Sequence, residues 1–146
     1  AEAIKADGWN FASHTWGHIK VGEDCSLEHL QKDTERWLQD VAPLIGGTDT
    51  IIFAHGQDLA AWNEDYAASP KYQYLKSKGF SIFCNVDSSK YFVQIEDGFL
   101  RMGRRNLDGY RLWEAVYGGN DRLNDLFDAS SVIDPKRPTD ASLYTL

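Results

Sequence analysis

The alternation of short apolar runs with amphipathic segments is the feature that most constrains the fold of this chain. Residues 50–54 and 80–86 are apolar runs of the length typical of buried strands. Before and between them, apolar residues recur every three or four positions over residues 27–41 and 70–78, which predicts helices. Strands that alternate with helices in this way predict an α/β fold with a mainly parallel sheet.

Turn and cap signals set the limits of these elements. Ser26 is suited to cap the helix over residues 27–41, and Pro43 is expected to end it. The chain from Asp134 onward is expected to be a loop. The other predicted elements are a strand over residues 9–13, a hairpin over 91–102 that turns at Asp97-Gly98, and helices over 107–117 and 123–127.

Composition limits the size and the partners of the fold. With 146 residues, 42% of them hydrophobic, the chain can form one globular domain, which we assign to residues 1–146. The net charge of −7 argues against nucleic acid or an anionic membrane surface as partner, and no apolar run is long enough for a membrane span. Five Trp and seven Tyr suit stacking on sugar rings and ordinary core packing equally well.

The first residues suggest that the chain is cut from a longer protein. Residues 1–8 read as the end of a helix that Gly8 closes. The strand over residues 9–13 would then lack its neighbour, and exposed strand edges are usually paired or covered. We therefore expect this edge to pair with a missing N-terminal part of the domain or to form a homodimer.

His14 and His18 form the strongest candidate site. They lie four residues apart directly after a predicted strand, and the chain has only four histidines. Neutral imidazole is a preferred ligand of zinc, cobalt and nickel, and catalytic zinc takes three protein ligands and leaves one position open. The pair is therefore half of a metal site. His29, in the first turn of the helix over residues 27–41, is expected to be an ordinary surface histidine.

The segment His14-Thr15-Trp16-Gly17-His18 resembles the His-Ser/Thr-x-x-His signature of the polysaccharide deacetylases, the NodB-like carbohydrate esterases. A helix ending in Gly8 before it and a helix led by Ser26 after it extend the resemblance. The resemblance implies part of a distorted (β/α) barrel, of which this chain is the C-terminal portion. It implies hydrolysis of acetyl groups from a polysaccharide, His14 and His18 as ligands of zinc (alternatively cobalt or nickel), and an extracellular or cell-surface location.

Later signatures of the family match this chain in part. Gly56 matches the Gly of Arg-x-Pro-Tyr-Gly, and the resemblance places the preceding His55 beside the acetyl carbonyl as a catalytic residue. Asp87 matches the start of the next signature and would line the sugar groove, while Arg104 and Arg105 would bind substrate. The chain departs from the family in lacking the Asp-Asp pair, which supplies the base and the third metal ligand. It also lacks the late Leu-x-His that supplies the acid, because no histidine follows His55. We therefore expect this chain alone to be incomplete and inactive.

The positions of these residues along the chain favour a shared site. The carboxyl ends of parallel strands meet at one edge of a sheet, where the chemistry of such folds gathers. The Arg104-Arg105 pair is also consistent with a solvated charge cluster beside a helix that Asp108 caps. The polar residues that follow the predicted strands are His14 and His18, His55 and Asp58, Asp87, and Arg104 with Arg105.

Two functions from other classes stay open. A non-catalytic carbohydrate-binding or scaffold domain that keeps the deacetylase fold would account for the missing signatures, and metal content would distinguish it from an enzyme. A flavodoxin-like binding domain could use Asp87-Ser88-Ser89 at a strand end, but the chain lacks a Gly-rich phosphate loop.

Overall fold

The computed structural model describes residues 1–60, 65–86, 92–140 and 142, and the chain divides into two compact units. The first unit comprises residues 1–87 and 91–104, and the second comprises residues 88–90 and 105–146. Compact units of this kind occur within one domain as well as in separate domains. The assignment of residues 1–146 to a single domain therefore stays a prediction.

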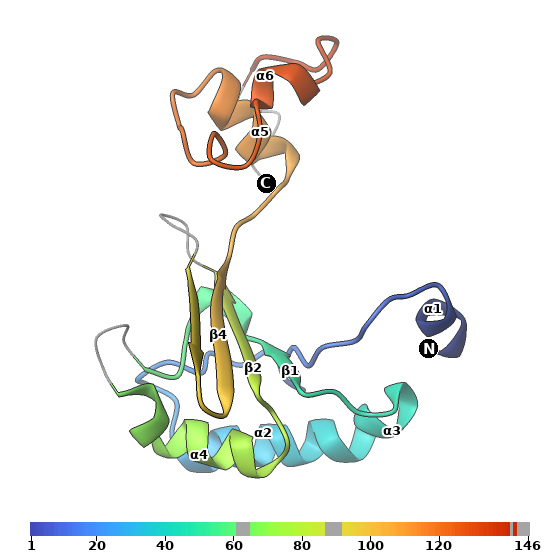
Figure 1. The fold of residues 1–146 in the computed structure, drawn as a ribbon, viewed down its shortest axis with the longest axis vertical. Helices are drawn as coiled ribbons and strands as arrows, with labels where there is room; N and C mark the ends of the chain where they lie inside the picture. Colours follow the sequence, from blue (N-terminus) through green and yellow to red (C-terminus); the bar gives the residue numbers. More distant parts are fainter. Residues whose placement is uncertain (61–64, 87–91, 141, 143–146) are drawn as a thin grey trace. The chain divides into compact units, whose positions relative to one another are not determined.

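The described part of the first unit is built on a four-stranded sheet in the order β1-β2-β4-β3 (Figure 1). Strands β1, β2 and β4 run parallel to one another, and β3 runs antiparallel to β4. The predicted α/β fold with a mainly parallel sheet is confirmed. The strands are β1 (Thr50–Ile52), β2 (Ile82–Val86), β3 (Val93–Glu96) and β4 (Phe99–Arg104).

The two longest helices of this unit begin where the sequence predicts. In α2 (Leu27–Asp40), the Ser26 hydroxyl accepts a hydrogen bond from the His29 backbone N–H at 3.1 Å. Pro70 is the first residue of α4 (Pro70–Ser77). The N–H groups of the first turn have no partner within the helix, and proline suits this position because it has no N–H. Pro43 does not end the helical region, because it lies in the first turn of a further short helix, α3 (Ala42–Ile45). The remaining short elements are α1 (Glu2–Ala6), η1 (Ala54–Gly56) and η2 (Tyr66–Ala68).

The core lies between α2, α4 and one face of the sheet. Leu30 and Trp37 of α2 and Leu75 of α4 are buried in one cluster with Ile51 of β1 and Phe83 of β2. Buried and half-buried positions alternate along the whole of β4. This alternation is expected of a strand with only one face packed on the core.

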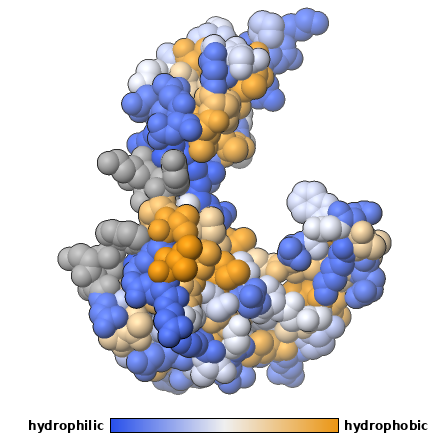
Figure 2. All heavy atoms as spheres, in the orientation of Figure 1, coloured by the Kyte–Doolittle hydropathy of each residue, from blue (hydrophilic) through white to orange (hydrophobic). Residues whose placement is uncertain are grey.

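The other face of the sheet carries exposed apolar side chains. Val93 and Ile95 of the edge strand β3 pair with Met102 and Leu100, which alternate with the core-facing residues of β4. Val93 and Ile95 are exposed, and Figure 2 shows apolar side chains gathered over the strands. Exposed apolar patches beside a strand edge are surfaces that proteins usually cover. The missing part of the domain or the second copy, which we expect at the edge formed by residues 9–13, stays a prediction.

The strand predicted over residues 9–13 is wrong except at its last residue. Ser13 forms a single parallel bridge with Ile51. The Phe11 carbonyl instead accepts a hydrogen bond from the Thr48 hydroxyl at 2.7 Å, and Trp9 is 68% exposed. The Thr48 side chain thus bonds the carbonyl that a neighbouring strand would otherwise bond. Residues 9–12 therefore do not join the sheet.

The second unit contains α5 (Gly109–Val116) and α6 (Ala129–Val132). The Asp108 carboxylate accepts a hydrogen bond from the Arg111 backbone N–H at 2.8 Å, so the predicted cap is confirmed. The helix predicted over residues 123–127 is wrong, because this segment forms turns. Asn120 accepts a hydrogen bond from the Arg122 N–H, and short polar side chains of this kind compete with helix formation. Within the described residues, no helix has both the length and the apolar content to cross a membrane.

We expect Leu75→Ala to lower the free energy of unfolding by about 2–5 kcal/mol, because the fully buried side chain would leave a cavity between α4 and the sheet. Urea unfolding followed by circular dichroism measures the change. Leu44→Ala is the matched control, since Leu44 is 71% exposed, and it should change the stability by less than about 0.5 kcal/mol. Equal effects of the two substitutions would contradict the described core.

Candidate functional site

Three of the four histidines of the chain lie side by side in the first unit. His14 directly follows the bridge at Ser13, and His55 follows β1, the strand that Ser13 pairs with. The ring centroids of His14 and His18 are 4.9 Å apart, and those of His18 and His55 are 4.5 Å apart. All three side chains are exposed. The chain therefore brings the predicted metal ligands and the predicted catalytic histidine to one accessible place at the carboxyl ends of neighbouring parallel segments.

Backbone carbonyls orient two of the three imidazole rings. His14 Nδ1 lies 2.7 Å from the Ile52 carbonyl oxygen, and His55 Nε2 lies 3.2 Å from the His18 carbonyl oxygen. Because a carbonyl oxygen only accepts, neutral His14 carries its proton on Nδ1 and keeps a lone pair on Nε2. Proteins orient metal-binding imidazoles with the same kind of hydrogen bond, so the geometry of His14 fits a metal ligand.

Backbone strain is concentrated in this group of residues. Among the described residues, the non-glycine residues with positive φ are Thr15 (65°), His18 (52°) and His55 (57°). The left-handed region costs roughly 1–2 kcal/mol for a residue with a Cβ atom, and more for a β-branched residue such as Thr15. Such conformations persist only where the surrounding structure holds them, and they are frequent at functional sites.

Asp33 of α2 holds the loop between His14 and His18. Its carboxylate accepts hydrogen bonds from the backbone N–H groups of Trp16 at 2.9 Å and Gly17 at 2.7 Å. Asp33 is only 7% exposed, so these bonds satisfy a carboxylate that water scarcely reaches. A Cβ atom at residue 17 would lie 3.1 Å from an Asp33 carboxylate oxygen, and glycine therefore permits this close approach.

Asp58 anchors the loop that carries His55. Its carboxylate accepts hydrogen bonds from the Tyr66 hydroxyl at 2.8 Å, the Asn85 side-chain amide at 2.9 Å and Arg101 Nε at 2.8 Å. Asn85 lies on β2 and Arg101 on β4, and the Arg101 side chain is only 3% exposed. The buried charge of Asp58 is therefore paired and hydrogen-bonded, and it ties the loop to two strands.

Burial raises the pKa of several groups in the first unit. The pKa of the Tyr66 hydroxyl is raised, first by burial and then by the neighbouring Asp58 carboxylate. Burial also raises the pKa of the free thiols of Cys25 and Cys84. Both cysteines therefore remain thiols near neutral pH, and neither has the thiolate character of a nucleophile.

The remaining residues predicted for the site are Asp87, Arg104 and Arg105. Asp87 lies outside the described residues. Arg104 is the last residue of β4, two strands from β1, whereas Arg105 belongs to the second unit, where its guanidinium lies 4.0 Å from the Asp125 carboxylate. Their role in substrate binding stays a prediction. His29 is exposed, as predicted.

Sequence analysis missed Asp33. Leu30, Thr34 and Trp37 are buried on the core-facing side of α2, and Asp33 lies on the same side. A carboxylate in the middle of an apolar helix face was the signal that could have found it, because buried charges need partners. Asp58 was placed at the correct edge, but its partner Arg101 was not identified.

The described residues contain no group of three or more His, Cys, Asp or Glu side chains that could hold a metal ion. The metal site at His14 and His18 stays a prediction.

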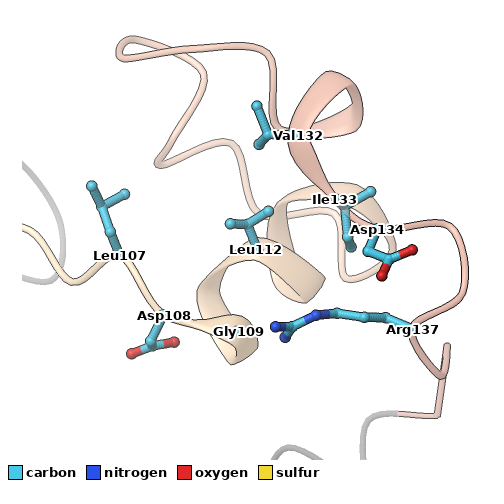
Figure 3. Close-up of a pocket in the computed structure, with 8 residues that line it drawn as sticks. All are labelled: Leu107, Asp108, Gly109, Leu112, Val132, Ile133, Asp134 and Arg137. Carbon is cyan, nitrogen blue, oxygen red and sulfur yellow. The ribbon is translucent and has the colours of Figure 1, made fainter.

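A cavity of about 320 Å³ lies in the second unit, between α5 and the segment that includes α6 (Figure 3). None of the predicted site residues lines this cavity.

Comparison of the chain with protein-family models, curated proteins and solved structures finds no match. The assignment of function therefore depends on the geometry of the three histidines and on the resemblance carried by residues 14–18.

We expect Tyr66 to make the protein less stable at high pH. In the unfolded chain the hydroxyl ionises near pH 10, whereas the raised pKa keeps it protonated in the folded protein. The unfolded state thus releases a proton that the folded state retains, so this contribution is fully present below about pH 10 and is lost as pH rises further. Urea unfolding between pH 8 and 11 should show a weaker pH dependence for Tyr66→Phe than for the parent, and equal slopes would contradict the assignment.

Proposed function

We propose that this chain is part of a metal-dependent polysaccharide deacetylase, an enzyme that hydrolyses acetyl groups on a polysaccharide. The observation that carries the proposal is the convergence of His14, His18 and His55, two of them in left-handed backbone conformations, at the carboxyl ends of neighbouring parallel segments. Such strain is retained where function requires a fixed geometry. The resemblance of residues 14–18 to the deacetylase signature supports the same conclusion.

In this proposal, His14 and His18 hold the metal, zinc in the first place. The hydrogen bond from His14 Nδ1 to the Ile52 carbonyl presents Nε2 as the ligand atom. When bound, zinc lowers the pKa of a coordinated water toward about 7 and polarises a substrate carbonyl. Asp33 fixes the backbone between the two ligands, so the imidazoles are held in place before the metal binds.

We propose that His55 lies beside the acetyl carbonyl of the substrate. Its Nε2 donates to the His18 carbonyl oxygen, so Nδ1 is the nitrogen that can first take up a proton and then donate it to the leaving group. Backbone N–H groups of the same loop are suited to stabilise the oxyanion. The base that takes a proton from water is assigned by the resemblance to an Asp-Asp pair, which this sequence does not contain.

The parallel strands β1, β2 and β4, with α2 and α4 packed on one face, are consistent with a segment of a distorted (β/α) barrel. In such a barrel, substrate binds at the carboxyl ends of the strands. Asp87, after β2, and Arg104, at the end of β4, are proposed to contact the sugar there, together with Arg105. The proposed partner is an acetylated polysaccharide at the cell surface or outside the cell.

We expect the chain to bind zinc or cobalt weakly, because two imidazoles form an incomplete coordination shell. His14→Ala and His18→Ala should abolish the binding. Isothermal titration with zinc and the visible absorption of added cobalt measure it.

His29→Ala is the matched control, since His29 is exposed in the first turn of α2 and takes no part in the site. It should bind the metal as the parent does. Identical titrations of the parent, His14→Ala and His18→Ala would contradict the metal site.

We expect the natural protein to release acetate from acetylated xylan or acetylated chitooligosaccharides in the presence of zinc. His55→Ala should slow the release by about a hundredfold or more, the loss typical of a missing proton donor. His29→Ala should leave the rate unchanged. Metal binding without acetate release from any of these substrates would contradict the proposed reaction.

A non-catalytic carbohydrate-binding or scaffold domain is the second candidate. It is favoured by the partly lost Arg-x-Pro-Tyr-Gly signature and by the lack of any histidine after His55 that could supply the acid. Metal content separates the two candidates, since a scaffold that has lost its chemistry has no need to bind zinc at His14 and His18.

A further inference from the structure

Helix α5 of the second unit and the residue that follows it, its C-cap, carry three aromatic side chains. Tyr110, Trp113 and Tyr117 follow one another at helical spacings of three and four residues. The ring centroids of Tyr110 and Trp113 are 6.3 Å apart with planes only 15° from parallel, and those of Trp113 and Tyr117 are also 6.3 Å apart. We call these three residues the aromatic ladder.

A different face of α5 packs within the unit. Leu112, which is not on the ladder, lines the cavity between α5 and α6 together with Val132 and Ile133 (Figure 3). No residue of α5 is buried, and Tyr117 is 47% exposed. Tyr110 and Trp113 are half-buried, so the ladder is partly open to solvent and is not enclosed in a core.

Polar groups lie directly beside the ladder. Arg111 forms an ion pair with Glu114, and the Arg111 guanidinium carbon lies 5.5 Å from the centre of the Tyr110 ring. Trp113 Nε1 donates a hydrogen bond to the Thr139 carbonyl oxygen at 2.7 Å, which fixes the indole against the C-terminal segment. Flat rings held in place next to a guanidinium and a carboxylate offer both apolar faces and hydrogen-bonding groups.

This combination suits a sugar chain better than a nucleic acid. A pyranose ring offers C–H groups on its faces, which pack on aromatic planes, and hydroxyls at its rim, which bond to Arg and Glu side chains. Nucleic-acid bases also stack on aromatic rings, but they require a positive groove for the phosphates. Acidic residues outnumber basic ones between residues 105 and 146, so such a groove is not favoured.

We propose that the aromatic ladder of α5, with Arg111 and Glu114, binds a neutral glycan chain in the second unit. This surface goes beyond the proposed hydrolysis, because it needs neither a metal nor the histidines. Its role is to hold the polymer, whereas the histidine site acts on the acetyl group.

Titration of the whole chain with xylohexaose and with chitohexaose in the presence of EDTA tests the proposal, with intrinsic tryptophan fluorescence and calorimetry as readouts. We expect at least one of the two oligosaccharides to bind. Trp113→Ala should weaken binding about tenfold or more, as loss of a principal stacking surface requires. Tyr117→Ala, at a more exposed position that is less critical for folding, should also weaken it.

Trp9→Ala is the matched control, since Trp9 is an exposed tryptophan of the first unit, at 68%, and it should bind as the parent does. Absence of binding by both oligosaccharides, or unchanged affinity in folded Trp113→Ala and Tyr117→Ala, overturns the proposal. Binding that is lost in His14→Ala but kept in Trp113→Ala places the glycan at the histidines. This result overturns the proposed glycan site on the aromatic ladder and leaves the proposed function intact. Concentration-dependent dimerisation that the ladder substitutions abolish also overturns it, because the ladder would then be an interface between copies of the chain.

Discussion

The ion pair between Asp58 and Arg101 is the interaction on which the first unit most depends. It joins the loop after β1 to β4, and the same carboxylate reaches β2 through Asn85. A buried ion pair contributes little net stability compared with apolar residues of similar size, but an unpaired buried charge is strongly destabilising. The network therefore penalises any arrangement in which the loop and the two strands are not in place together.

Two carboxylates thus hold the loops that carry the three histidines. Asp33 holds the loop of His14 and His18, and Asp58 holds the loop of His55. Neither carboxylate is hydrogen-bonded to an imidazole among the described residues, yet each holds a segment that contains a left-handed residue. Strain in the histidine loops is consequently offset by hydrogen bonds in the less exposed layer behind them, which leaves the imidazoles themselves accessible.

The predictable part of the fold is the part that local physics determines. The periodicity of α2, the apolar runs of β1 and β2, and the caps at Ser26 and Asp108 all depend on residues close in sequence, and all are confirmed. The segment over residues 9–13 failed because Thr48, distant in sequence, bonds the Phe11 carbonyl. The partners of Asp33 and Asp58 were beyond reach for the same reason, since Arg101 lies 43 residues from Asp58 along the chain. The motif of residues 14–18 identified the candidate site, but not the scaffold that supports it.

The hydrogen bonds of Asp33 affect how the loop between His14 and His18 can change during evolution. The carboxylate recognises main-chain N–H groups and makes no demand on the side chain of Trp16. Among the loop residues between the histidines, Gly17 is restricted by the close approach of the carboxylate, and Thr15 bonds the Ile19 N–H through its hydroxyl. The Trp16 side chain makes separate contacts with α2, since its indole N–H donates a hydrogen bond to Asp40 at 3.1 Å and the Arg36 guanidinium lies over its ring. An exchange at position 16 loses these contacts but leaves the two main-chain bonds to Asp33, which set the path of the loop between the histidines.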